Sequence, residues 1–147
     1  MPTKKLIQRA ILETASAKLK LHADLPESLP IIQRVQKIQD RVSKMGFEWR
    51  SIDHAIDKLQ EEVIEIRLAI ERNDVANMEE ELGDCFFALL KVARLLEMDP
   101  ELALKKANDK FVKRFEVVMD HCQQDGRDMQ NTDIDILMGY WKRAKNL

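Results

Sequence analysis

Two pairs of acidic residues are the first candidates for chemistry in this sequence. Glu62 and Glu65 form one pair, and Glu81 and Asp84 form the other, with the members of each pair three positions apart. Residues at this spacing share one face of a helix, so each pair presents two carboxylates together. Clustered carboxylates repel unless a cation joins them, and oxygen ligands on rigid helices suit Mg²⁺ or Mn²⁺. The pattern predicts a metal site that serves phosphate chemistry.

The same acidic residues also fit an ordinary solvated helix face. The run Glu79-Glu80-Glu81 is typical of such a face, and acidic residues near a helix start interact favourably with the helix dipole. Gly83 favours the metal site, because a glycine inside a helix is costly and often marks the close approach of another element. Spacing alone leaves both interpretations open.

A cationic pair lies further along the chain. Lys110 and Arg114 are one helical turn apart and flank Phe111. Lysine and arginine bind phosphate oxygens directly, although these two could equally pair with acids of a neighbouring helix. Trp141 could stack on a nucleobase, whereas most tryptophans in small helical bundles anchor the core. The cations and the tryptophan therefore remain candidates for binding a nucleotide.

The elements that must position these residues are all helical. No segment alternates apolar and polar residues as a half-buried strand does. Ser51, Asp74 and Asp99 are the expected N-caps of three helices, and Gly46 is expected to end an earlier one. Helices are predicted over residues 4–21, 31–45, 52–72, 75–97 and 100–125, and from about 132 to the end of the chain. The predicted fold class is an all-α helical bundle.

Apolar residues at spacings of three and four predict one buried stripe on each of three helices. The first stripe comprises Ile52, Ile56, Leu59, Val63, Ile66 and Ile70. The second comprises Met78, Leu82, Cys85, Leu89, Val92 and Leu96. The third comprises Leu104, Ala107, Phe111, Phe115, Val118 and Cys122. A short connection at residues 73–74 predicts that the first two helices form an antiparallel hairpin with the acidic pairs beside its core.

Composition narrows the class of protein. The chain has 147 residues, of which 45% are hydrophobic and 34% charged, and its net charge is −2. This length predicts one domain, and the near-neutral charge argues against non-specific binding to nucleic acid. No apolar stretch reaches the roughly 20 residues of a membrane span, and no P-loop motif occurs. Two distant cysteines, Cys85 and Cys122, predict buried thiols in a reducing, cytoplasmic environment.

Several motifs together resemble the MazG family of nucleoside triphosphate pyrophosphohydrolases. Residues 61–65 and 81–84 resemble the EExxE…ExxD signature of that family. Further similarity to the C-terminal domain of bacterial MazG lies in residues 34–39, 46–49 and 103–115 and in Trp141. The resemblance covers roughly residues 25–147. It implies an all-α, Mg²⁺-dependent enzyme, with Mn²⁺ as a substitute, in which water attacks the α-phosphorus to give nucleoside monophosphate and pyrophosphate.

The resemblance also assigns roles to individual residues. Those that match the Mg²⁺ ligands are Glu62, Glu65, Glu81 and Asp84. Those that match groups near the nucleotide are Lys58, Lys110 and Arg114 for the triphosphate and the aromatic Trp141. Glu61 and Glu62 are the candidate catalytic residues, and Glu61 is a candidate for positioning the attacking water. The family relation further implies a homodimer or higher homo-oligomer.

The chain departs from the long MazG form, which has two tandem domains. Residues 31–147 are expected to form one catalytic domain, and residues 1–30 a helix with a linker-like segment that either docks or is a frayed leader. Two other functions stay open: a helical module that binds a nucleotide or a protein without hydrolysis, and hydrolysis of another phosphate-rich metabolite. Neither the base nor the sugar of a substrate is predicted.

Overall fold

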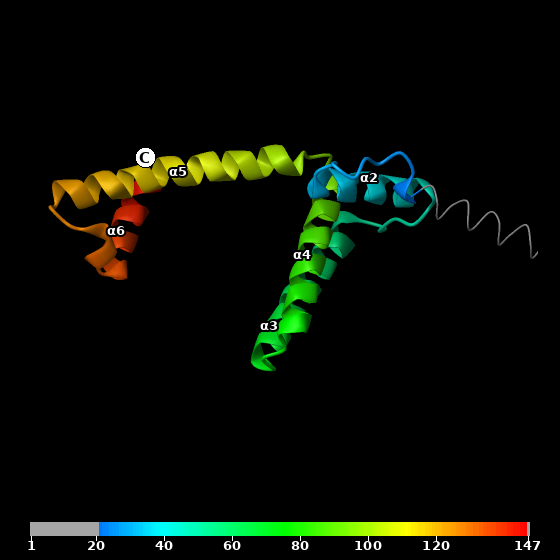
Figure 1. Ribbon diagram of the computed structural model, residues 1–147, viewed down its shortest axis with the longest axis horizontal. Coiled ribbons are helices and arrows are strands. Elements are labelled where there is room, and N and C mark those ends of the chain that lie inside the picture. Colours follow the sequence, from blue (N-terminus) through cyan, green and yellow to red (C-terminus); the bar gives the residue numbers. More distant parts are fainter. Residues whose placement is uncertain (1–20, 147) are drawn as a thin grey trace, which may run out of the picture. The chain divides into compact units, whose positions relative to one another are not determined.

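The computed structural model describes residues 21–146, and that part of the chain contains helices and no strand. The α-helices are α2 (Ile31–Lys44), α3 (Ile52–Glu71), α4 (Val75–Leu95), α5 (Pro100–Gln124) and α6 (Ile134–Ala144), with a 3₁₀-helix, η1 (Met129–Asn131), before the last (Figure 1). The all-α fold class is confirmed. The helix predicted over residues 4–21 lies, except for its last residue, outside the described residues. No helix in the described part combines the length and the hydropathy of a membrane span.

Local capping signals set the helix boundaries. The side chains of Ser51, Asp74 and Asp99 each accept a hydrogen bond from the backbone N–H three residues later, at the starts of α3, α4 and α5. Each such bond satisfies a donor that the helix leaves unpaired, which is worth about 1 kcal/mol. Gly46, at φ +92°, follows the end of α2 in a conformation that other residues rarely adopt. The predicted caps are confirmed, whereas η1 was not predicted.

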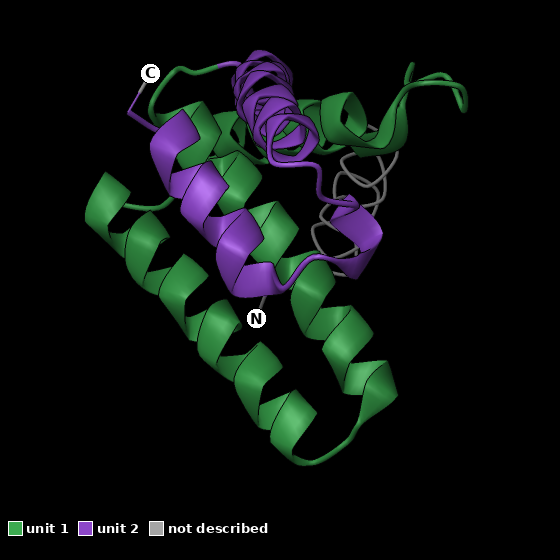
Figure 2. Cartoon of the chain, turned by 90° about the vertical axis from the view of Figure 1, so that its left-hand side faces the viewer, with its two compact units in different colours: residues 1–98 green, residues 99–147 purple. Residues whose placement is uncertain are grey.

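The chain divides into two compact units, residues 1–98 and residues 99–147, coloured separately in Figure 2. In the first unit, α3 and α4 pack side by side as an antiparallel hairpin, and α2 packs against α4 (Figure 1). In the second unit, α5 packs against α6. The hairpin prediction is confirmed. The predicted domain limits at residues 30 and 31 stay a prediction.

The buried residues of the hairpin differ from the predicted stripes. On α3 the buried residues are Ala55, Glu62 and Ala69. On α4 they are Ala88, Lys91 and Val92. The prediction of burial was right for Val92. It was wrong for Ile56, Val63 and Ile70 on α3, for Leu82 and Leu89 on α4 and for Leu96 directly after α4, all of which are exposed. Small alanine side chains let the helices approach closely, so the larger aliphatic side chains lie on the flank.

The second unit has a small core at the far end of α5. Val118 and Cys122 of α5 and Tyr140 of α6 are buried together. The prediction for α5 was therefore right for Val118 and Cys122 and wrong for Leu104, Phe111 and Phe115, which are exposed. Both cysteines are free thiols, and Cys122 is buried as predicted, whereas Cys85 is only partly buried.

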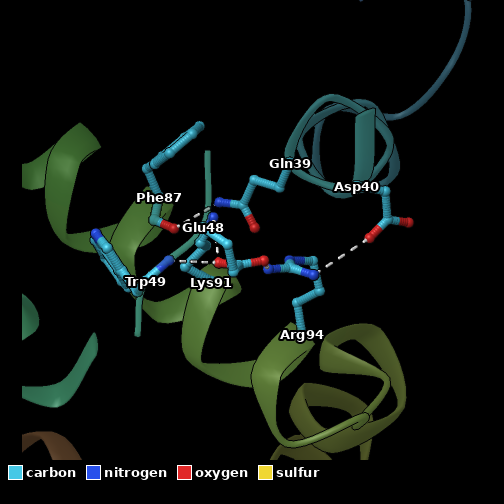
Figure 3. Close-up of polar contacts among 7 residues, drawn as sticks. All are labelled: Gln39, Asp40, Glu48, Trp49, Phe87, Lys91 and Arg94. Carbon is cyan, nitrogen blue, oxygen red and sulfur yellow. Dashed lines mark hydrogen bonds and ion pairs between the residues drawn. The ribbon is translucent and has the colours of Figure 1, made fainter. Parts of the chain in front are cut away.

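A cluster of charged residues attaches the connection between α2 and α3 to α4 (Figure 3). Its centre is Glu48, whose Oε1 lies 2.9 Å from Lys91 Nζ and whose Oε2 pairs with the Arg94 guanidinium. Asp40 of α2 approaches Arg94 at 3.9 Å. We call Asp40, Glu48, Lys91 and Arg94 the Glu48 cluster. Two acidic and two basic side chains balance one another there, which offsets the cost of removing them from water.

Neighbouring groups complete this attachment. Buried Gln39 donates from Nε2 to the Phe87 carbonyl oxygen at 2.9 Å, which ties α2 to α4 (Figure 3). The backbone N–H of Trp49 donates to Glu48 Oε1 at 2.9 Å, and Lys91 Nζ lies 5.5 Å from the centre of the Trp49 ring. Burial lowers the pKa of Lys91, against the opposing charge of Asp40. These contacts thus attach α2 and the connection between α2 and α3 to α4, the helix that carries Glu81 and Asp84.

Candidate metal and phosphate site

The hairpin brings one oxygen from each of three predicted ligands close together. Carboxylate oxygens of Glu62, Glu81 and Asp84 all lie within 4.8 Å of one another. Ligand oxygens of Mg²⁺ lie about 3 Å apart when adjacent and about 4 Å apart when opposite, so these oxygens would have to approach one another to share one ion. Glu62 is buried, Glu81 is partly buried and Asp84 is exposed, so the group runs from the hairpin interior to solvent. We call these three residues the acidic triad.

Glu65, the fourth predicted ligand, lies beside the triad. Burial, then the hydrogen bond with Glu65, then the charges of Glu65, Glu62 and Asp84 raise the pKa of Glu81 to about 7. A carboxyl group titrates this high first because burial disfavours its charged form, and second because the neighbouring carboxylates repel that charge. The donor set, oxygen only and with excess negative charge, fits a hard divalent cation.

Lys58 is the cation that the structure places at the acidic residues of α3. Its Nζ lies 2.6 Å from Glu62 Oε1 and 3.0 Å from Glu61 Oε1. The hydrogen bonds with Glu62 and Glu61 raise the pKa of Lys58, so the ammonium stays charged. The resemblance predicted that Lys58 contacts the triphosphate, but its ion pair with this predicted metal ligand was missed. The i, i+4 spacing of the two residues was the available signal.

Cys85 was predicted only as a core residue, yet it lies next to the acids. Burial and then the negative charges of Glu62, Glu81 and Asp84 raise the pKa of the Cys85 thiol. Soft metals bind the thiolate rather than the thiol. Near this site the cysteine therefore stays protonated, which leaves carboxylates as the available charged ligands.

The predicted cations Lys110 and Arg114 belong to the second unit. They line a groove of about 500 Å³ between α5 and α6, together with Lys106, Lys113 and Lys145. The last three were not predicted, although Lys106 and Lys113 fall on the same helical face as Lys110. The concentration of positive charge makes this groove suited to a phosphate chain.

The Trp141 side chain packs against the core of the second unit and is also partly exposed to solvent. Its ring packs against Phe111 at a centroid distance of 5.2 Å. It also lines an open hollow of about 560 Å³ with Met138, Lys142 and Lys145. Both interpretations of Trp141 therefore have structural support, because the ring anchors α6 on α5 and remains partly accessible.

Comparison with known proteins identifies the family of this chain. Residues 50–123 match the model of the MazG nucleotide pyrophosphohydrolase domain. The chain belongs to this family. It is 38% identical over 124 residues to a nucleoside triphosphate pyrophosphohydrolase of Escherichia coli (strain K12), which covers 83% of the chain and 47% of that relative. A nucleoside triphosphate pyrophosphohydrolase/pyrophosphatase MazG of Thermotoga maritima is 35% identical over 117 residues, covering 80% and 45%.

The match places most of the predicted site inside the MazG domain. Its residues 50–123 include Lys58, Glu61, Glu62, Glu65, Glu81, Asp84, Lys110 and Arg114, whereas Trp141 lies beyond them. The chain spans less than half the length of the curated relatives, so it corresponds to a single MazG domain. The roles of the individual residues stay predictions.

Proposed function

We propose that this chain hydrolyses nucleoside triphosphates to nucleoside monophosphates and pyrophosphate. The observation that carries the proposal is the acidic triad, whose carboxylate oxygens lie within 4.8 Å of one another in a member of the MazG family. Both curated relatives are named for the hydrolysis of nucleoside triphosphates. A cluster of unbalanced carboxylates is costly for a fold alone and is typical of a site built for a ligand.

The acidic residues fit a divalent cation. We propose that Glu62, Glu65, Glu81 and Asp84 hold Mg²⁺, with Mn²⁺ as a substitute. Bound there, the cation would supply the positive charge that stabilises the phosphate oxygens as pyrophosphate departs. The donor set, which consists of carboxylate oxygens only, supports this proposal. The raised pKa of Glu81, about 7, also supports it, because this carboxyl lacks a compensating positive charge.

The other predicted residues have separate tasks. Glu61, whose side chain is 56% exposed, would accept a hydrogen bond from the water that attacks the α-phosphorus and orient that water. The charged groups of Lys58, Lys110 and Arg114 would bind phosphate oxygens. Trp141 would pack its ring against the base, which gives little discrimination between bases.

Product analysis tests the reaction. The full chain is incubated with Mg²⁺ and a mixed pool of ribonucleotide and deoxyribonucleotide triphosphates, and the products are separated by ion-exchange chromatography. We expect monophosphates and pyrophosphate, and the order of depletion ranks the bases. Diphosphate with inorganic phosphate would contradict attack at the α-phosphorus. Absence of turnover would instead favour a binding module or another phosphate-rich metabolite.

The partner that we propose is a second copy of the chain. Ile56, Val63 and Ile70 recur at every seventh position of α3, and Leu82, Leu89 and Leu96 do so on α4. Each set forms one exposed line on its helix, and we call the two lines together the apolar stripe. Burying a side chain of this size contributes about 1.5–3 kcal/mol, and a second copy presents the same stripe across a two-fold axis.

Light scattering coupled to size exclusion tests this assembly. The full chain should elute as a dimer or higher oligomer, and the double variant Val63→Glu/Leu89→Glu should be monomeric. The matched control is Ile31→Glu, because Ile31 is an exposed aliphatic residue on α2, away from the stripe. A wild-type chain that stays monomeric at micromolar concentration would reject the assembly.

We further propose a cytoplasmic location, supported by the two free thiols.

A further inference from the structure

The buried carboxylate of the acidic triad has a positive partner in this structure. Lys58 Nζ lies 2.6 Å from Glu62 Oε1, and the Glu62 side chain is only 5% exposed. A buried carboxylate without compensating charge is strongly unfavourable. Among the residues that the structure describes, Lys58 is the one cation paired with a member of the triad. It therefore supplies the charge on which burial of Glu62 depends.

The Lys58 ammonium reaches Glu62 from the solvent side. The Lys58 side chain is 40% exposed and also contacts exposed Glu61 at 3.0 Å. Its stem of four carbons is flexible, so the ammonium can leave Glu62 while the helix stays in place. A divalent cation held by Glu62, Glu81 and Asp84 would lie a few ångströms from the ammonium, and the two positive charges would repel.

We propose that Lys58 takes the place of the divalent cation at Glu62, and that cation binding frees its ammonium to bind the phosphate chain of the nucleotide. This inference rests on the proposed function, because the cation and the nucleotide come from it. Its consequence is coupling. The cation releases a group that binds the nucleotide, so it tightens nucleotide binding. The nucleotide must then tighten cation binding by the same factor.

Two roles for Lys58 predict opposite changes in cation affinity when the residue is removed. If Lys58 only held the Glu62 carboxylate in the orientation that the cation requires, its removal would weaken cation binding. If Lys58 instead competes with the cation, its removal strengthens binding. The sign of the change therefore separates the two roles.

Binding of Mn²⁺ to the full chain without nucleotide is the test, measured by loss of the free-ion signal in electron paramagnetic resonance. We expect Lys58→Gln to bind Mn²⁺ about 10-fold more tightly than wild type, because a nearby positive charge is removed. Lys58→Arg keeps the charge and should stay within about twofold of wild type. The control is Arg67→Gln, which removes a positive charge from the same helix, and it should change affinity by at most about twofold.

A nucleotide analogue tests the coupling. The analogue α,β-methylene-dATP, which resists cleavage at the α-phosphorus, should tighten Mn²⁺ binding by wild type and do so far less for Lys58→Gln. Lysine ¹⁵N NMR gives a readout on the wild-type chain alone. The Lys58 Nζ signal, assigned by its loss in Lys58→Arg, should shift when Mg²⁺ is added and shift again with the analogue.

The outcomes separate this inference from the proposed function. Weaker or unchanged Mn²⁺ binding by Lys58→Gln, relative to Arg67→Gln, would overturn the inference while leaving the metal site intact. A Lys58 signal that ignores Mg²⁺ would overturn it as well. Failure of the wild-type chain to bind Mn²⁺ at all would overturn the metal site, and the proposed function and this inference would fall together.

Discussion

Two charged clusters share α4 and differ in how their charges are balanced. The Glu48 cluster has two acidic and two basic side chains, with Lys91 and Arg94 supplied by α4. The acidic triad takes Glu81 and Asp84 from the same helix, and its one paired cation among the described residues is Lys58. Asp84 and Lys91 are seven residues, about 10 Å, apart on one face. The balanced cluster serves the fold, whereas the unbalanced one is available for a ligand.

The difference has a physical basis. A charged side chain leaves water at little net cost only when opposite charges and hydrogen bonds replace the solvent. The Glu48 cluster meets the charge part of this condition within the protein, although the buried Nε of Arg94 has no hydrogen-bond partner there. In the triad the condition is unmet, and the Glu81 pKa of about 7 reflects its burial first and the repulsion by its acidic neighbours second. Removing a carboxylate should therefore harm stability at one cluster and activity at the other.

The largest expected effect comes from the triad. Asp84→Asn should reduce turnover by at least about 1,000-fold, a loss of roughly 4 kcal/mol of transition-state stabilisation. Its melting temperature in the absence of metal should stay equal to that of wild type or rise, because one repelling charge is gone. Steady-state kinetics and circular dichroism measure the two quantities. Glu80→Gln, an exposed acid on the same helix, should leave both unchanged. Full activity in Asp84→Asn would reject the site.

The next effect belongs to the Glu48 cluster. Glu48→Gln leaves the largely buried Lys91 and Arg94 without their closest acidic partner and should lower the free energy of unfolding by about 3 kcal/mol. Urea unfolding followed by circular dichroism measures the change. The control Asp40→Asn removes a half-exposed carboxylate 3.9 Å from Arg94 and should cost less than about 1 kcal/mol. If the two variants lost equal free energy of unfolding, Glu48 would be no more important to this cluster than Asp40.

The smallest effect is a pH dependence of the metal-free protein. The pKa of Glu81 is about 7 in the folded chain and 4.5 ordinarily, so between these values the folded state binds more protons than the unfolded state. Stability should therefore fall as pH rises from about 4.5 to about 7. Thermal unfolding in EDTA across this range should show the decline for wild type and a flatter profile for Glu81→Gln.

Added Mg²⁺ should reverse that trend. The proton and the cation compete for the Glu81 carboxylate, so Mg²⁺ should stabilise the fold more at pH 8 than at pH 6. The same unfolding experiment with Mg²⁺ in place of EDTA measures this. A stabilisation by Mg²⁺ that does not depend on pH would indicate that Glu81 is not a ligand.

Features encoded within a few residues were predictable from the sequence. The caps Ser51, Asp74 and Asp99 were recognised because a short polar side chain before a helix satisfies the N–H three residues later. The acidic residues Glu62, Glu81 and Asp84 were predicted as neighbours, because i, i+3 spacing and a short hairpin turn together restrict where they lie. Local geometry carried both predictions.

Most of the buried face of the hairpin lies one residue before the predicted stripes, although Val92 is buried as predicted. Large aliphatic residues suggested the stripe through Val63 and Leu89, whereas the helices meet through Ala55, Ala69 and Ala88. Hydrophobicity favours the face with the large aliphatic side chains, because the buried face carries Glu62 and Lys91 among its alanines. Only the small alanine side chains, however, allow the two backbones to approach closely. The error also concealed the apolar stripe that we propose for self-association.

The five α-helices of the described residues, their caps and the acidic character of the candidate site could be predicted from the sequence, because these depend on short spacings along one chain. Tertiary structure decided which carboxylate is buried, that Lys58 compensates it, and that Glu48 joins Lys91 and Arg94 from more than 40 residues away. Those outcomes depend on which helix faces pack together. That choice is a balance of packing and desolvation over the whole unit, and it leaves no signature within a single helical turn.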